Sequence, residues 1–195
     1  MTAPFSLLAD VGGTNSRVAL AQNGQLLEET IERIPNEGAG GLGEILGAYV
    51  TRRNVRVEAL CAAVAGPVTH SAQGSTARMT NLDWHITCAD LMAATGAKKA
   101  RLINDLQAQG WAIGHLAPRA LTPLRQSAEP LDPAAPKLVI GLGTGVNAAL
   151  VLDGEHGRMV TASESGHISL PVADARDWAL AQALTELEPG AQDGG

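Results

Sequence analysis

Aromatic side chains are scarce in this sequence: phenylalanine, tyrosine and tryptophan together make up 3% of its 195 residues. Apolar residues nevertheless amount to 45%, so the chain can bury a core, and that core must consist largely of aliphatic side chains and alanine. A chain of this length can form one sizeable domain or two small ones.

Cysteine is also rare, and neither Cys61 nor Cys88 belongs to a C-x-x-C pair or to a His/Cys cluster. A cysteine-based metal site is therefore not expected, and two isolated cysteines are typical of a protein from a reducing cytosol. The sequence does not begin like a signal peptide and contains no apolar run as long as a membrane span. We predict a cytoplasmic protein.

Positive charge is in the minority, because the formal net charge is −6. An acidic surface argues against a nucleic acid or an anionic membrane as partner. It leaves room for a phosphorylated ligand, which needs only a local positive potential.

The order of strand and helix signals predicts an α/β fold. Three antiparallel strands are expected at 5–10, 16–22 and 25–34, with Asn23-Gly24 as a hairpin turn, followed by a helix at 42–53 and a buried strand at 57–64. A hairpin around Gly74, strands at 100–103, 137–142, 147–152 and 158–162, and helices starting at Thr87 or Asp90, at 106–116 and at 175–187 are also expected. The proline-rich segment 118–136 predicts a surface excursion.

Two glycine-rich turns, Asp10–Thr14 and Gly141–Gly145, each separate two of these strands. Glycine permits positive φ and leaves no Cβ in the way of a ligand, and successive backbone N–H groups form a concavity that binds anions. The hydroxyls of Thr14 and Thr144 add donors. Many glycine-rich hairpins bind nothing, but two of the same design in one chain favour a phosphate-binding role.

Asp10 opens the first of these turns, directly after an apolar run. A carboxylate beside a phosphate can hold Mg²⁺ directly or through water. The alternative is that it caps the turn by accepting a hydrogen bond from the N–H of Gly12 or Gly13.

Other nucleotide signatures are weaker. A P-loop sequence is absent, and the segment Gly38–Gly43 fits G-x-G-x-x-G. Three residues separate this segment from the preceding strand, and Glu58 begins its strand instead of ending it. A dinucleotide-binding fold is therefore disfavoured.

Six segments, in order along the chain, resemble motifs of the bacterial glucokinases, ATP-dependent sugar kinases of the actin-like, hexokinase-type superfamily. They are "DVGGTNSR", "AVAGPV", "MTNLDW", "INDLQAQGWAI", "GLGTGVNAAL" and "ESGHISLP". The resemblance implies an actin-like (ribonuclease H-like) ATPase fold and the transfer of phosphate from ATP, with Mg²⁺, to the 6-hydroxyl of glucose, which feeds glycolysis.

The resemblance also assigns roles to residues. Asp105 would be the general base on the sugar hydroxyl, and Asn104, Glu164 and His167 would contact the sugar together with it. The phosphates of ATP would lie against the two turns, at Asp10, Gly12, Gly13 and Thr14 and at Gly143, Thr144 and Gly145. From the residues alone, Asn104 and Asp105 could equally cap the following helix, and Glu164 and His167 could be ordinary surface residues.

The sequence departs from the family toward its end. It has no counterpart of a further sugar-contacting glutamate or of the "SG.GL" adenosine motif, and Asn147 replaces a usual glycine. We expect a first lobe at 1–103 and an unfinished second lobe at 104–195, whose exposed apolar face would favour self-association, for example as a homodimer. A non-catalytic sugar-binding remnant and a kinase for another hexose are the alternatives.

Overall fold

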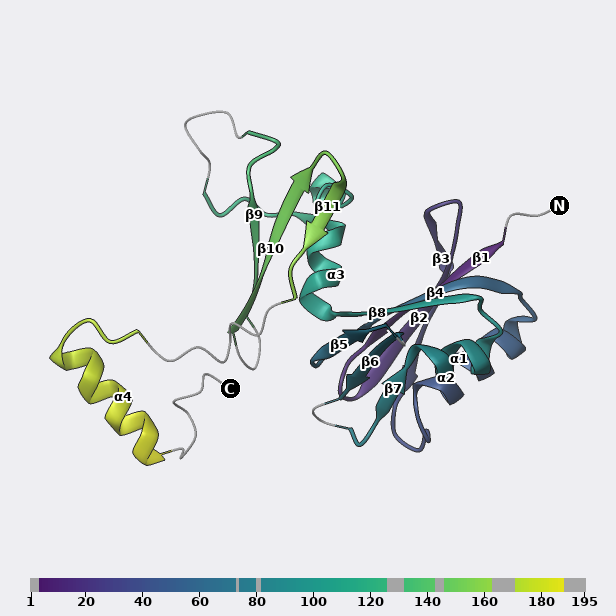
Figure 1. Ribbon diagram of the computed structural model, residues 1–195, viewed down its shortest axis with the longest axis horizontal. Coiled ribbons are helices and arrows are strands. Elements are labelled where there is room, and N and C mark those ends of the chain that lie inside the picture. Colours follow the sequence, from purple (N-terminus) through teal and green to yellow (C-terminus); the bar gives the residue numbers. More distant parts are fainter. Residues whose placement is uncertain are drawn as a thin grey trace. The chain divides into compact units, whose positions relative to one another are not determined.

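The computed structural model describes residues 4–72, 74–79, 82–125, 132–142, 146–162 and 171–187 (Figure 1). The chain divides into two compact units, Met1–Asp105 and Leu106–Gly195. Strands and helices occur in both units, which confirms the predicted α/β class. The assignment of residues 1–103 and 104–195 to two kinase lobes stays a prediction.

A five-stranded sheet forms the centre of the first unit, in the order β3-β2-β1-β4-β8. Its strands are β1 (Phe5–Val11), β2 (Asn15–Gln22), β3 (Gln25–Pro35), β4 (Val57–Val64) and β8 (Lys99–Asn104). The first three pair antiparallel, as predicted, and β4 and β8 run parallel to β1. Asn23 and Gly24 have φ of 52° and 77° at the β2–β3 hairpin, as a tight two-residue turn requires.

Two helices, α1 (Leu42–Arg53) and α2 (Cys88–Thr95), complete the core of this unit. The apolar spacing of α1 buries one stripe of side chains, which consists of Leu42, Ile45, Leu46, Tyr49 and Val50. Of the two candidates Thr87 and Asp90, Thr87 caps α2, because its Oγ1 accepts a hydrogen bond from Asp90 N at 3.1 Å. The helices pack closely: a Cβ at Gly47 would lie 2.9 Å from Ala94 O.

A second, three-stranded sheet was not expected beyond the hairpin around Gly74. It consists of β5 (Val68–Ser71), β6 (Gly74–Arg78) and β7 (His85–Thr87), in that order. The third strand is only three residues long, and it is a strand because its backbone pairs with β6. Local sequence carries little of that information.

Tyr49 lies at the centre of the larger core and is fully buried, and its hydroxyl donates to Thr30 O at 2.6 Å. We expect Tyr49→Phe to lower the free energy of unfolding by about 1 kcal/mol, because it removes one buried hydrogen bond and leaves the ring in place. Arg53 also donates to Thr30 O, at 3.4 Å, which limits the loss. Urea denaturation measures the change, and an unaltered midpoint would contradict this account.

The second unit contains α3 (Asp105–Ala112), η1 (Pro118–Ala120) and α4 (Ala175–Leu187), and an antiparallel sheet in the order β11-β10-β9. The strands are β9 (Lys137–Leu142), β10 (Val146–Gly154) and β11 (Gly157–Val160). The prediction of a helix over 106–116 was wrong at its end. Gly114 has a φ of 87°, and Arg158 donates to the carbonyls of Trp111 and Ile113 near the end of α3.

An ion cluster holds one end of the β10–β11 hairpin. Asp153 accepts from Arg158 Nε at 2.7 Å and from Lys137 Nζ at 2.9 Å. The Arg158 guanidinium and the Lys137 ammonium hold the pKa of Asp153 well below its usual range. Three charged side chains from β9, β10 and β11 therefore lie together at the end of the sheet opposite to Leu142 and Val146.

One face of this second sheet is apolar and exposed. Along β9 the side chains of Leu138, Ile140 and Leu142 are 60%, 56% and 80% exposed, and Val146 of β10 is 56% exposed. The buried cluster of this unit, within the described residues, contains only Leu106, Ala149, Val151 and Val160. The expectation of an exposed apolar face in this half of the chain is confirmed.

Candidate functional site

Three parallel strands of the first unit end at the same edge of the sheet. The last residues pair in register, Val11 of β1 with Val64 of β4 and Val64 with Asn104 of β8. Two strand spacings, about 10 Å, therefore separate the ends of β1 and β8. The Gly12–Thr14 turn and the Asn104-Asp105 pair follow these strands, at the edge where α/β sheets bind ligands.

The Gly12–Thr14 turn is compact. Gly12 N donates to Asn15 O at 3.0 Å, and Ala65 N donates to Val11 O at 3.0 Å beside it. Gly12 does not use the positive φ that glycine permits, and a Cβ there would meet nothing closer than Asn15 O at 3.5 Å. The backbone conformation at this position therefore does not require glycine. The missing side chain leaves space beside the turn.

Asp10 lies opposite Arg17 across the β1–β2 pair, and its Oδ2 accepts from Arg17 Nη1 at 3.3 Å. Both side chains are exposed. Asp10 does not cap Gly12, because the Gly12 N–H bonds to Asn15 O, and the alternative that it caps Gly13 stays open.

A magnesium ion takes most of its ligands from water and from the phosphates of its substrate, and needs one or two carboxylates from the protein. The exposed Asp10 carboxylate beside the glycine turn fits that requirement. Among the described residues, no three His, Cys, Asp or Glu side chains come together in a cluster that could hold a metal by itself.

Asn104 ends β8 and Asp105 begins α3. Asn104 is buried, at 3% exposure, whereas Asp105 is exposed. Register places Asn104 on the sheet face of Val11 and Val64, whereas Asp10 is on the opposite face with Ala63 and Ile103. The structure thus brings these residues to one edge but on two faces of the sheet, and the helix-capping alternative for Asn104 and Asp105 stays open.

The remaining predicted residues lie outside the described part of the chain. They are Gly143, Thr144 and Gly145 of the second turn and the sugar-contacting pair Glu164 and His167. The strands that flank the second turn are described, and Leu142 pairs with Val146 in register.

Sequence reasoning missed Asn36, which follows β3 and is 2% exposed. Its side chain bonds to Gly12 O and to Ser16 Oγ, so it lies directly against the glycine turn. The partners are 24 and 20 positions away. No local pattern could have revealed contacts of that length.

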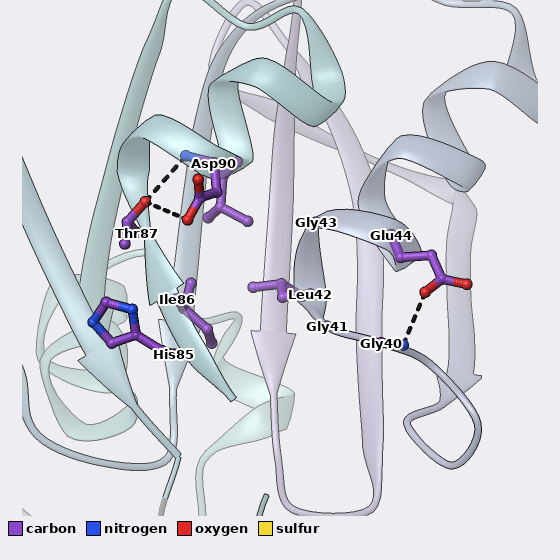
Figure 2. Close-up of a pocket in the computed structure, with 10 residues that line it drawn as sticks. Gly40, Gly41, Leu42, Gly43, Glu44, His85, Ile86, Thr87 and Asp90 are labelled. Carbon is purple, nitrogen blue, oxygen red and sulfur yellow. Dashed lines mark hydrogen bonds between the residues drawn. The ribbon is translucent and has the colours of Figure 1, made fainter. Parts of the chain in front are cut away.

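A cavity of about 310 Å³ lies between the first turns of α1 and α2 (Figure 2). Gly40, Gly41 and Gly43 of the G-x-G-x-x-G segment line it, together with the carboxylates of Glu44 and Asp90. Two carboxylates repel a pyrophosphate, and Glu44 Oε2 already accepts from Gly40 N at 2.8 Å. None of the predicted site residues is among the described residues that line this cavity. The two carboxylates of the lining argue against a dinucleotide site.

Of the two cysteines in the first unit, Cys88 is buried and Cys61 is partly buried. Cys88 is 7% exposed, and burial raises the pKa of the Cys61 thiol.

Within the described residues, no helix combines the length and apolar character needed to cross a bilayer.

A family model described as Glucokinase matches residues 7–189. The chain belongs to the glucokinase family. All of the residues predicted from the motifs, from Asp10 to His167, lie inside the matched range.

Curated glucokinases give the same result. The chain is 32% identical to the glucokinase of Marinobacter nauticus over 89% of its own length and 53% of that protein. It is 33% identical to the glucokinase of Caulobacter vibrioides over 95% of its own length and 55% of that protein. The chain thus spans about half the length of the curated glucokinases that it matches.

Solved glucokinase structures share the fold. A glucokinase from an Antarctic psychrotroph aligns with a TM-score of 0.74 and 28% identity, over 95% of this chain and 57% of the other. A glucokinase from Balamuthia mandrillaris, solved in complex with glucose, aligns with a TM-score of 0.70 at 22% identity, over 97% and 57%. The predicted actin-like fold of sugar kinases is confirmed.

Proposed function

We propose that this chain carries the phosphate-binding and catalytic residues of an ATP-dependent glucokinase, which transfers a phosphoryl group from ATP to the 6-hydroxyl of glucose. The observation that carries the proposal is the common edge of β1 and β8. It puts a glycine turn and an exposed carboxylate, Asp105, about two strand spacings apart in a chain of the glucokinase family.

Each group at this edge has a task in phosphoryl transfer, which depends on positioning, charge neutralisation and a base more than on covalent chemistry. The N–H groups of Gly13 and Thr14 in this turn hold phosphate oxygens, since the Gly12 N–H already donates to Asn15 O. Asp105 accepts the proton of the sugar hydroxyl, and its exposure makes it the more accessible member of its pair. Asp10 would hold Mg²⁺, which neutralises phosphate charge when bound.

Other residues are proposed for the sugar and for the second phosphate contact. Asn104, Glu164 and His167 offer amide, carboxylate and imidazole groups, which suit the hydroxyls of a hexose. Gly143, Thr144 and Gly145 are the residues proposed for the second phosphate contact. In this proposal the protein acts in the cytoplasm, and the exposed face of β9 supports self-association as a homodimer.

A coupled assay for glucose 6-phosphate on the purified 195-residue chain tests the proposal. Product should require glucose, ATP and Mg²⁺ together. Omission of each component in turn is the control, and ATP hydrolysis without glucose 6-phosphate would contradict a sugar kinase.

A non-catalytic sugar-binding protein is the second candidate, because the sequence has no counterpart of the family's adenosine motif. Calorimetry with glucose and with ATP-Mg²⁺ separates the two functions. We expect residual glucose affinity and much weaker nucleotide affinity, since the adenosine motif has no counterpart in the sequence. Glucose binding without any turnover would favour the second candidate.

Gly12→Ala separates the binding role of the first turn from its structural role. The methyl group has room in the fold, so the free energy of unfolding should change by less than about 1 kcal/mol. The same methyl group narrows the approach of phosphate to the turn, so ATP-Mg²⁺ affinity should fall by about tenfold or more.

Calorimetry measures that affinity, and thermal unfolding measures stability in the same preparation. Gly24→Ala, in the β2–β3 hairpin, is the contrasting control: its φ of 77° makes the substitution strained, so stability should fall while nucleotide affinity does not change. Equal nucleotide affinity of Gly12→Ala and wild type would contradict the role of this turn.

A further inference from the structure

The side chain of Asn36 makes an unusual set of contacts for a loop residue. It follows the last residue of β3, yet only 2% of it is exposed. Buried asparagine needs partners for both its amide N–H₂ and its carbonyl oxygen. The segment Gly12–Ser16 supplies them.

Three hydrogen bonds join Asn36 to this segment. Asn36 Nδ2 donates to Gly12 O at 2.7 Å, and its Oδ1 accepts from Ser16 Oγ at 2.8 Å. The backbone N–H of Asn36 donates to Thr14 O at 2.9 Å. One residue therefore bonds to Gly12 and Thr14, the two ends of the glycine turn, and to Ser16 in the strand that follows it.

These contacts also fix where the turn's donors point. A peptide unit is planar and trans, so the N–H of Gly13 points opposite to the carbonyl of Gly12. Asn36 draws the Gly12 carbonyl inward. The Gly13 N–H is thereby directed away from Asn36, which leaves it available to an anion on the other side of the turn.

We propose that Asn36 is a positioning residue for the phosphate turn, acting through Gly12 and Ser16 to aim backbone N–H groups at the phosphates of the nucleotide. This role rests on the proposed kinase function for its ligand. It predicts that Asn36 governs nucleotide affinity although it does not touch the nucleotide.

Asn36→Asp is the informative substitution, because it keeps the shape and the acceptor for Ser16 and replaces the donor to Gly12 O by an oxygen. Two oxygens then face each other, and the turn loses its fixed orientation. We expect the KM for ATP-Mg²⁺ to rise by about tenfold, with the KM for glucose unchanged and kcat within about threefold of wild type. Ser16→Ala, which leaves the bond to Gly12 O, should raise the KM for ATP-Mg²⁺ by less.

Thr30→Val is the matched control. Thr30 is also a buried polar residue of the β2–β3 pair, and its hydroxyl donates to Leu27 O at 2.6 Å and accepts from Leu20 N at 2.9 Å. It should lose stability by an amount comparable to Asn36→Asp and keep the wild-type KM for ATP-Mg²⁺. A purely structural role of Asn36 would make the two variants behave alike.

Amide hydrogen exchange provides a readout that does not depend on activity. In Asn36→Asp, exchange of the peptide that spans residues 12–16 should be faster by about tenfold than in wild type or Thr30→Val. Unchanged exchange there would overturn the positioning role. A wild-type chain that neither binds nor turns over ATP-Mg²⁺ would refute the proposed function instead, while the exchange comparison still decides the role of Asn36.

Discussion

Asp105→Asn is expected to lower kcat for glucose phosphorylation by about 10²–10⁴-fold, the range that a positioned general base contributes. Asparagine has nearly the same shape as aspartate but cannot accept the proton of the sugar hydroxyl. The KM values for glucose and ATP should change by much less, because the loss falls on the transition state. The side chain is exposed, so the fold should tolerate the substitution.

Glu155→Gln is the matched control for this loss. Glu155 is an exposed carboxylate in the turn between β10 and β11, and its replacement makes the same change of charge elsewhere on the chain. It should keep wild-type turnover. If turnover of Asp105→Asn instead stays within a few-fold of wild type, Asp105 is not the general base. Its role would then be limited to the start of α3, which is the helix-capping alternative.

Several elements were predicted residue for residue, namely α1, β4, β9 and α4. In each, the pattern of apolar side chains and the flanking Gly, Pro or charged residues agree on the same boundaries. The predictions were wrong at elements whose existence or whose end depends on strand pairing or on a backbone turn. The strand β7 exists through its partner β6, and α3 ends early, near Gly114 and the contacts of Arg158.

The candidate site shows the same division. Motifs located Asp10, Gly12 and Asn104, because polar residues and glycines directly after apolar runs mark the ends of strands. The placement of Asp10 and Asn104 on opposite faces of the sheet follows from strand register, and the motifs carry no information on register. Asn36 carries no signal in its own neighbourhood, since its partners are brought to it only by the β2–β3 pairing.

Asp10→Asn should abolish most of the Mg²⁺-dependent turnover, with a loss of about 100-fold or more, since a metal at the phosphates contributes several kcal/mol of charge stabilisation. Stability should hardly change. The carboxylate and its partner Arg17 are 58% and 65% exposed, and an exposed ion pair contributes about 0–1 kcal/mol. Glucose affinity should equal that of wild type, because Asp10 is not among the residues proposed to contact the sugar.

Arg17→Met distinguishes a metal ligand from a partner in an ion pair. It removes the guanidinium that lies 3.3 Å from Asp10 Oδ2 and leaves the carboxylate. If Asp10 serves the metal, Arg17→Met keeps Mg²⁺-dependent turnover, and half-maximal activity is reached at the same or a lower Mg²⁺ concentration, because a competing cation is gone. If Asp10 serves only to hold Arg17, both variants lose activity alike, and titration of turnover against Mg²⁺ in the two proteins tells these outcomes apart.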